Sequence, residues 1–142
     1  MSSLIKQKTI KKEVLFEGIA LHSGIKSKIK LIPAECNKGI IFIRKDKNKN
    51  NTIKANWKNV TKTTLSTTIS NKFNLKVSTI EHLMSAIAAL QIDNLEIEIS
   101  GPEAPILDGS SKIYLKKLLD IGVVSQNENK QFIKILKKIT FK

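Results

Sequence analysis

The residues of this sequence with the clearest capacity for chemistry are Glu81 and His82, in the stretch STIEHLMSA (78–86). A neutral imidazole is a good metal ligand, and a carboxylate beside a metal-bound water can act as a general base. The chain has only one other histidine, His22. The same stretch is also typical of an ordinary helix start, because Ser78 and Glu81 have the spacing of a capping box. The local sequence leaves both interpretations open.

The helix that carries this pair is expected to run from Ser78 to about Leu90. One face is an apolar stripe that belongs on a sheet, formed by Ile80, Leu83, Met84, Ile87 and Leu90. The opposite face is small and nearly uncharged in a lysine-rich chain, and carries His82, Ser85, Ala86 and Ala89. We therefore expect both faces to be covered, with His82 near a helix start on a surface to which another layer docks.

The elements around this helix indicate an α+β fold, a mixed β-sheet with two helices on one face. β-prone segments are predicted at 9–21, 25–34, 39–45, 52–57, 65–70, 94–100 and 132–141. A turn is predicted at LHSG, a polar loop at 45–51 and a stiff loop at 101–111. The second helix is predicted from near Ser111 to Ile121, with Gly122 as its C-terminal cap.

The charge of +13 raises the possibility of nucleic-acid binding, which two features disfavour. Arg44 is the only arginine among 25 basic residues, and aromatic residues make up 5% of the chain. No apolar stretch is long enough to span a membrane, so a cytoplasmic protein is expected. Residues 77–111 contain no Lys or Arg but six acids. This acidic segment indicates either a cation neighbourhood or chance clustering on solvated positions.

Four stretches, in this order and at these separations, resemble a known enzyme family: GIALHSG (18–24), TTLSTTI (63–69), VSTIEHLMSAIAALQIDN (77–94) and APILDGS (104–110). They are similar to the N-terminal half of the UDP-3-O-acyl-N-acetylglucosamine deacetylases, zinc amidases that commit sugar nucleotide to lipid A synthesis in Gram-negative bacteria. The resemblance covers essentially all of 1–142. It implies one half of a two-domain sandwich of the ribosomal protein S5 domain 2-like kind, with helices packed between the sheets.

The resemblance also implies roles for individual residues. His82 would be one of three protein ligands of a catalytic Zn²⁺, although imidazole suits Fe²⁺ as well. Glu81 would be the general base for the metal-bound water. Leu65 and Ser66 would lie beside the metal and the substrate, unless they belong to a plain strand. His22 would lie near the active site, unless it only stabilises its turn.

Of the family's remaining features, one has a counterpart in these residues and the others have none. Asp108 resembles a family aspartate near the site, but Asp-Gly is a good turn pair and a structural role is favoured. The second and third zinc ligands belong to an H-K-x-x-D-type motif of the family's second domain, as does a histidine that acts as general acid. We therefore expect 1–142 to be the N-terminal domain only, able to supply a base and one ligand for a UDP-sugar acyl substrate but inactive alone.

One further expectation accompanies this interpretation, and two other interpretations compete with it. Without its C-terminal domain the chain would expose a docking surface and self-associate. A different interpretation is a non-catalytic remnant or binding module that keeps the fold. A third is a basic nucleic-acid-binding domain, although no nucleic-acid partner is expected from the composition.

Overall fold

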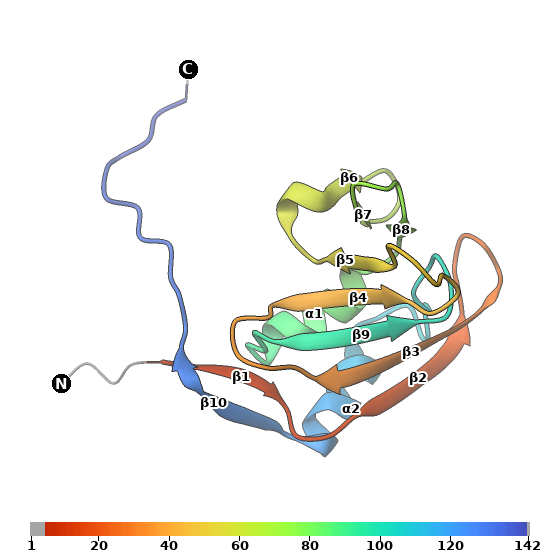
Figure 1. Ribbon diagram of the computed structural model, residues 1–142, viewed down its shortest axis with the longest axis horizontal. Coiled ribbons are helices and arrows are strands. Elements are labelled where there is room, and N and C mark those ends of the chain that lie inside the picture. The colour runs from red at the N-terminus through yellow and green to blue at the C-terminus, as the bar shows by residue number, and fades with distance from the viewer. Residues whose placement is uncertain (1–4, 142) are drawn as a thin grey trace.

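The computed structural model describes residues 5–141 and has the expected α+β architecture (Figure 1). Its main sheet has five strands in the order β2-β3-β9-β4-β5 and is mixed, because β4 and β9 pair in parallel. The strands are β2 (Val14–Ile19), β3 (Lys26–Pro33), β4 (Ile40–Arg44), β5 (Thr52–Lys54) and β9 (Leu95–Ile99). The central strand β9 alternates as predicted: Leu95, Ile97 and Ile99 are fully buried, while the two glutamates between them face the other side.

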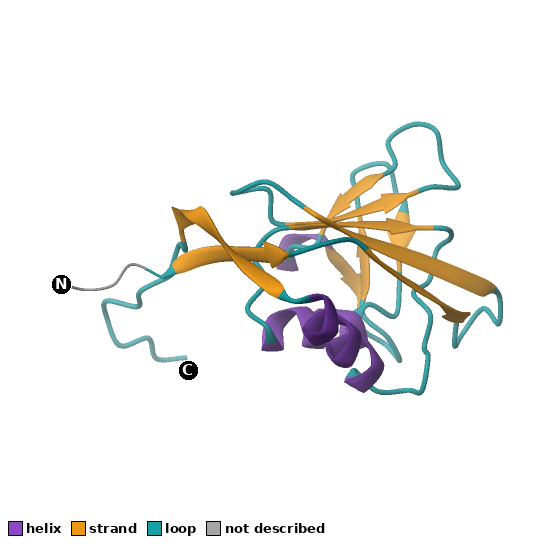
Figure 2. Ribbon diagram, turned by 90° about the horizontal axis from the view of Figure 1, so that it is seen from below, coloured by secondary structure: helices purple, strands orange, loops and turns teal. Residues whose placement is uncertain are grey.

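Two helices cover one face of this sheet (Figure 2). They are α1 (Glu81–Ala89) and α2 (Lys112–Ile121). The second ends at Gly122, whose φ of +83° is the left-handed conformation that favours glycine at a helix end. In α1, Leu83 and Ile87 are buried as predicted, but Ala86 is also buried, so only part of the small face is open. Within residues 5–141, neither helix is long and apolar enough to cross a membrane.

Two smaller sheets complete the fold. One pairs β1 (Lys6–Ile10) with β10 (Val123–Asn129) in antiparallel fashion. The other has the order β6-β7-β8, and its strands are β6 (Val60–Lys62), β7 (Thr68–Ser70) and β8 (Lys76–Val77). A short 3-10 helix, η1 (Trp57–Asn59), leads into β6. This small sheet lies on the β5 side of the molecule (Figure 1), and the TTLSTTI stretch (63–69) forms the connection between β6 and β7 and the start of β7.

The strand predicted at 132–141 is wrong. The last strand is β10, and residues 132–141 extend away from the domain without regular structure (Figure 1). Ile133 is 98% exposed and Phe141 is 92% exposed. A strand requires backbone partners, and no segment of the described chain pairs with this one. Residues 132–141 therefore have a β-prone composition but no described strand with which to pair.

The predicted capping box is also wrong. The helix begins at Glu81 rather than at Ser78, and its N-cap residue Ile80 makes no side-chain cap hydrogen bond. The physical reason is Thr79, whose φ of +56° breaks the helical path immediately before the helix. The Ser78 hydroxyl instead donates to the carbonyl of Pro102 at 3.3 Å. The Glu81 side chain consequently takes no part in a capping box.

Gly18 of the first motif is required by the close approach of the 104–110 loop. A Cβ at this position would lie 3.1 Å from both Pro105 Cβ and Leu107 Cδ2. We expect Gly18→Ala to destabilise the protein by about 1–3 kcal/mol, since overpacking forces the backbone apart. Gly101→Ala is the matched control, because its Cβ would make an ordinary 3.6 Å contact with Ile25. Urea unfolding of the two variants measures the difference, and an equal loss would contradict the expectation.

Candidate functional site

The four motifs that carry the resemblance meet at one end of the domain. The 104–110 loop joins the first motif through the Ile106 N–H, which donates to the carbonyl of Ile19 at 2.9 Å. It joins the third motif through the Ala104 N–H, which donates to the carbonyl of Ser78 at 3.0 Å. The second motif joins the third where the Thr67 N–H donates to Glu81. The spacing of the motifs in the sequence thus corresponds to a single cluster in space.

Glu103 holds this cluster together and was not singled out by the sequence. It is only 3% exposed, yet its carboxylate has no cationic partner in the described chain. Instead it accepts hydrogen bonds from the backbone N–H groups of His22 (2.8 Å) and Ser23 (2.9 Å) and from the Thr79 hydroxyl (3.0 Å). Burial raises the pKa of Glu103, but these donors outweigh it and hold the pKa below its ordinary value. Glu103 therefore fixes the His22 turn against the start of α1.

Three residues of the cluster have strained backbones. Thr79 has a φ of +56°, Leu65 a φ of +63° and Leu107 a φ of +54°, although none of them is a glycine or an asparagine. Such conformations cost about 1–3 kcal/mol each and persist where the surroundings hold them. The Glu103 hydrogen bond to Thr79 and the Glu81 hydrogen bond next to the Leu65 turn are two such restraints. The strain is concentrated where the motifs meet.

The carboxylate of Glu81 is partly buried and held at one oxygen. Its Oε2 accepts a hydrogen bond from the Thr67 N–H at 2.9 Å. Along the described chain, its Oε1 has no hydrogen-bond partner. A small apolar hollow of about 250 Å³, lined by Ile80, Met84 and Trp57 among others, adjoins the carboxylate. The fixed carboxylate can therefore accept a proton at its second oxygen.

His82 is partly buried in the first turn of α1, next to Glu81. Successive helix residues point about 100° apart, so the two side chains diverge. No group of three His, Cys, Asp or Glu residues that could hold a metal ion occurs within residues 5–141. These residues do not form a zinc site by themselves, although His82 is of the right chemical type to contribute one ligand.

His22, Leu65 and Ser66, the three candidate substrate-binding residues, line one hollow of about 540 Å³. His22 and Leu65 are exposed, and Ser66 is partly buried. Glu81 and His82 do not line it. The turn that joins the hollow to Glu81 passes through Thr67, which lies between lining residues Ser66 and Thr68. The structure thus brings the three candidates together in one hollow. The Thr67 N–H of the same turn holds the Glu81 carboxylate.

The acidic segment 77–111 does not form a metal site. Glu96 and Glu98 pair with Lys38 (2.7 Å) and Lys45 (2.9 Å) on the outer face of the sheet. Asp108 accepts hydrogen bonds from the backbone and hydroxyl of Ser110, as expected for a turn residue. The carboxylates of these three acids therefore pair with neighbouring protein groups and stabilise the local structure.

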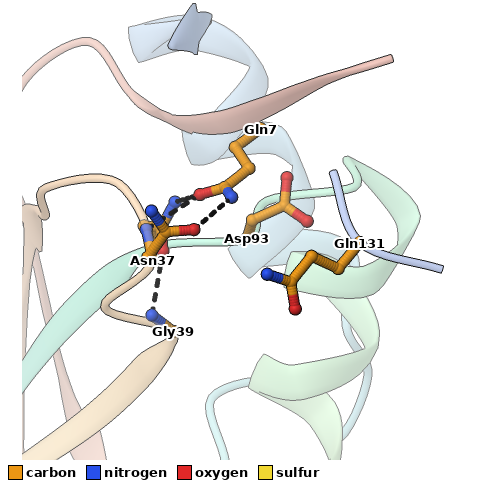
Figure 3. A pocket seen from close by; sticks show the side chains of 6 residues that line it. Gln7, Asn37, Gly39, Asp93 and Gln131 are labelled. Atoms are coloured by element: carbon orange, nitrogen blue, oxygen red, sulfur yellow. Dashed lines mark hydrogen bonds between the residues drawn. The ribbon is translucent and has the colours of Figure 1, made fainter. Parts of the chain in front are cut away.

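A third hollow, of about 300 Å³, lies beyond the C-terminal end of α1, at the end of the third motif (Figure 3). Gln7 donates to Asn37 Oδ1 at 2.7 Å and accepts from the Asn37 N–H at 2.9 Å. Asn94 accepts from the Gly39 N–H at 2.8 Å, and Asp93 accepts from the Lys8 N–H at 2.8 Å. Because these polar groups satisfy one another, the hollow has a structural role.

The fold and the clustered motifs define the class of protein to which the chain belongs. Residues 7–142 match the family described as LpxC: UDP-3-O-acyl N-acetylglycosamine deacetylase. The chain is a member of that family.

Several curated relatives carry the name UDP-3-O-acyl-N-acetylglucosamine deacetylase. The chain is 46% identical over 137 residues to that of Saccharophagus degradans and 43% identical over 136 residues to that of Pasteurella multocida. It is 45% identical over 139 residues to that of Teredinibacter turnerae. These matches cover 96–98% of the chain but 45–46% of each relative. The chain thus spans about half the length of the curated relatives it matches.

Proposed function

We propose that this chain is the first domain of a zinc-dependent deacetylase that hydrolyses the acetamide of UDP-3-O-(3-hydroxyacyl)-N-acetylglucosamine, in the cytoplasm, at the committed step of lipid A synthesis. The observation that carries the proposal is the Glu81 carboxylate, held at one oxygen by Thr67 and next in sequence to His82. We infer the reaction from the membership of the chain in this family. The second half of the relatives would supply the second domain.

In this proposal Glu81 is the general base. Its Oε2 stays fixed by the Thr67 N–H, and its Oε1 takes the proton from the attacking water. His82 would contribute one imidazole ligand to the metal, and the second domain would contribute the other ligands and the general acid. A bound Zn²⁺, or Fe²⁺, would bring the pKa of water towards neutrality. Glu81 and His82 have separate roles because their side chains diverge on the helix.

His22, Leu65 and Ser66 would contact the substrate in the hollow they share. The Ser66 hydroxyl can donate to a sugar or acyl oxygen, and exposed Leu65 can contact an apolar group. The exposed small residues of α1, Ser85, Ala88 and Ala89, would form the surface on which the second domain docks.

Acetate release from the UDP-linked acyl sugar tests the proposal. We expect a chimera of this chain with the unmatched part of the Saccharophagus degradans relative to release acetate, and the activity to disappear with a chelator and return with Zn²⁺. The 142-residue chain alone is expected to be inactive, because its described residues lack a full ligand set. A folded, zinc-loaded chimera that releases no acetate would refute the proposal.

A further inference from the structure

The hollow that contains His22 has a lining suited to an anion. Two lysines, Lys62 and Lys76, line it together with the imidazole of His22. Hydroxyl groups line it as well, from Thr61, Thr64, Ser66, Thr68 and Ser78. No Asp or Glu belongs to the lining. Ammonium and hydroxyl donors without a competing carboxylate are the groups that bind phosphate oxygens.

The small sheet places the two lysines on either side of β7 and on one face. Lys62 of β6 is opposite Thr68, and Lys76 of β8 is opposite Ser70. Opposite residues of antiparallel strands project to the same face, as do residues two apart on one strand. The lysine backbones are thus two strand spacings apart across the sheet and offset by two residues along it, in total roughly 12 Å. Their long side chains can converge on one group between them.

Neither ammonium is engaged elsewhere in the described chain. Five other lysines of the described chain are within 3.1 Å of a carboxylate, namely Lys28, Lys30, Lys38, Lys45 and Lys130. Lys62 and Lys76 have no such partner. Glu103 of the cluster is buried and already accepts three hydrogen bonds, from His22, Ser23 and Thr79. The positive charge of the two lysines is therefore available to a ligand.

We infer that Lys62, Lys76 and the hydroxyl groups between them form a binding site for a phosphate or diphosphate group. A hollow of about 540 Å³ accommodates a diphosphate with part of the molecule it carries. If the proposed function holds, the group is the diphosphate of the nucleotide-sugar substrate, and the two lysines determine its orientation towards Glu81.

Binding of inorganic pyrophosphate, UDP and uridine to the 142-residue chain tests the inference. The two histidines give two separate imidazole signals in proton NMR, of which that of His22 reports the hollow. We expect pyrophosphate and UDP to shift the His22 signal saturably and uridine to leave it unchanged. The double variant Lys62→Met/Lys76→Met should bind both anions about tenfold or more weakly, since two charge-assisted contacts are lost.

The matched control is Lys12→Met/Lys54→Met, which removes the same charge at exposed positions outside the hollow. It should keep the wild-type affinity within about twofold. Equal weakening by both double variants, or none by the first, would overturn the site. Uridine binding as tight as UDP would overturn it too. Acetate release by the chimera without pyrophosphate binding by the chain would overturn the site alone, whereas the reverse result would overturn the proposed function alone.

Discussion

Replacing Glu103 with glutamine is expected to lower the free energy of unfolding by about 2–3 kcal/mol, although the side chain keeps its size. The carboxylate uses Oε1 for the His22 N–H and the Thr79 hydroxyl, and Oε2 for the Ser23 N–H. In glutamine one of these oxygens becomes an NH₂ group that faces a donor. A buried donor is then left without an acceptor, and the His22 turn separates from Thr79. Urea unfolding at pH 7 measures the loss.

Glu98→Gln is the control, because it makes the same chemical change in an ion pair with Lys45 at the surface. It is expected to cost about 0–1 kcal/mol. The pKa of Glu103 lies below its ordinary value of 4.5 in the folded state. Its contribution to stability is therefore present above about pH 4.5 and is lost as the pH falls through the folded-state pKa. Glu103→Gln should remove this part of the acid dependence. Equal costs at both positions would contradict the role of Glu103.

Replacing Glu81 with glutamine should lower kcat of the chimera by about 10²–10⁴-fold, the usual contribution of a general base. Glutamine keeps an oxygen that can accept the hydrogen bond from Thr67, so the turn and the helix start stay in place. It cannot accept a proton from water at neutral pH. We therefore expect thermal stability and zinc content to be unchanged while acetate release falls. Steady-state kinetics and metal analysis of the same preparation separate these effects.

Glu96→Gln serves as the control for this variant, since Glu96 pairs with Lys38 on the outer face of the sheet. It should retain wild-type kcat within about twofold, because an ion pair at the protein surface contributes little to stability. If Glu81→Gln retained full activity with bound zinc, the carboxylate would not be the base. Loss of zinc together with activity would instead assign Glu81 a structural role.

Most of the fold was predictable because its elements have strong periodic patterns. The alternation of Leu95, Ile97 and Ile99 identified the central strand, and Gly122 marked the end of α2. Two predictions failed for non-local reasons. Ser78 and Glu81 have capping-box spacing, but Thr79 adopts a positive φ, and its hydroxyl donates to the distant Glu103. Segment 132–141 has strand composition but no partner strand among the described residues.

The resemblance to the family singled out His22, Leu65 and Ser66 as candidates, and the structure places them in one hollow. Their roles stay predictions, and the contacts that connect the motifs were not predicted. The importance of Glu103 could not be read from the sequence, where it is one acid among six in segment 77–111. Its role depends on three donors, two of them some 80 residues away in sequence. Only the fold brings such donors to one carboxylate.

The central claim is that this chain holds one zinc ligand, His82, and depends on a second domain for the rest. Zinc content after dialysis against a mild chelator tests it most directly, in the 142-residue chain, in the chimera and in the chimera with His82→Ala. We predict one zinc per molecule in the chimera and none retained by the other two. The chain alone offers a single imidazole, and the His82→Ala chimera keeps only the ligands of the second domain; neither incomplete set holds the ion against the chelator. Stoichiometric zinc in the chain alone, or in the His82→Ala chimera, would contradict this account.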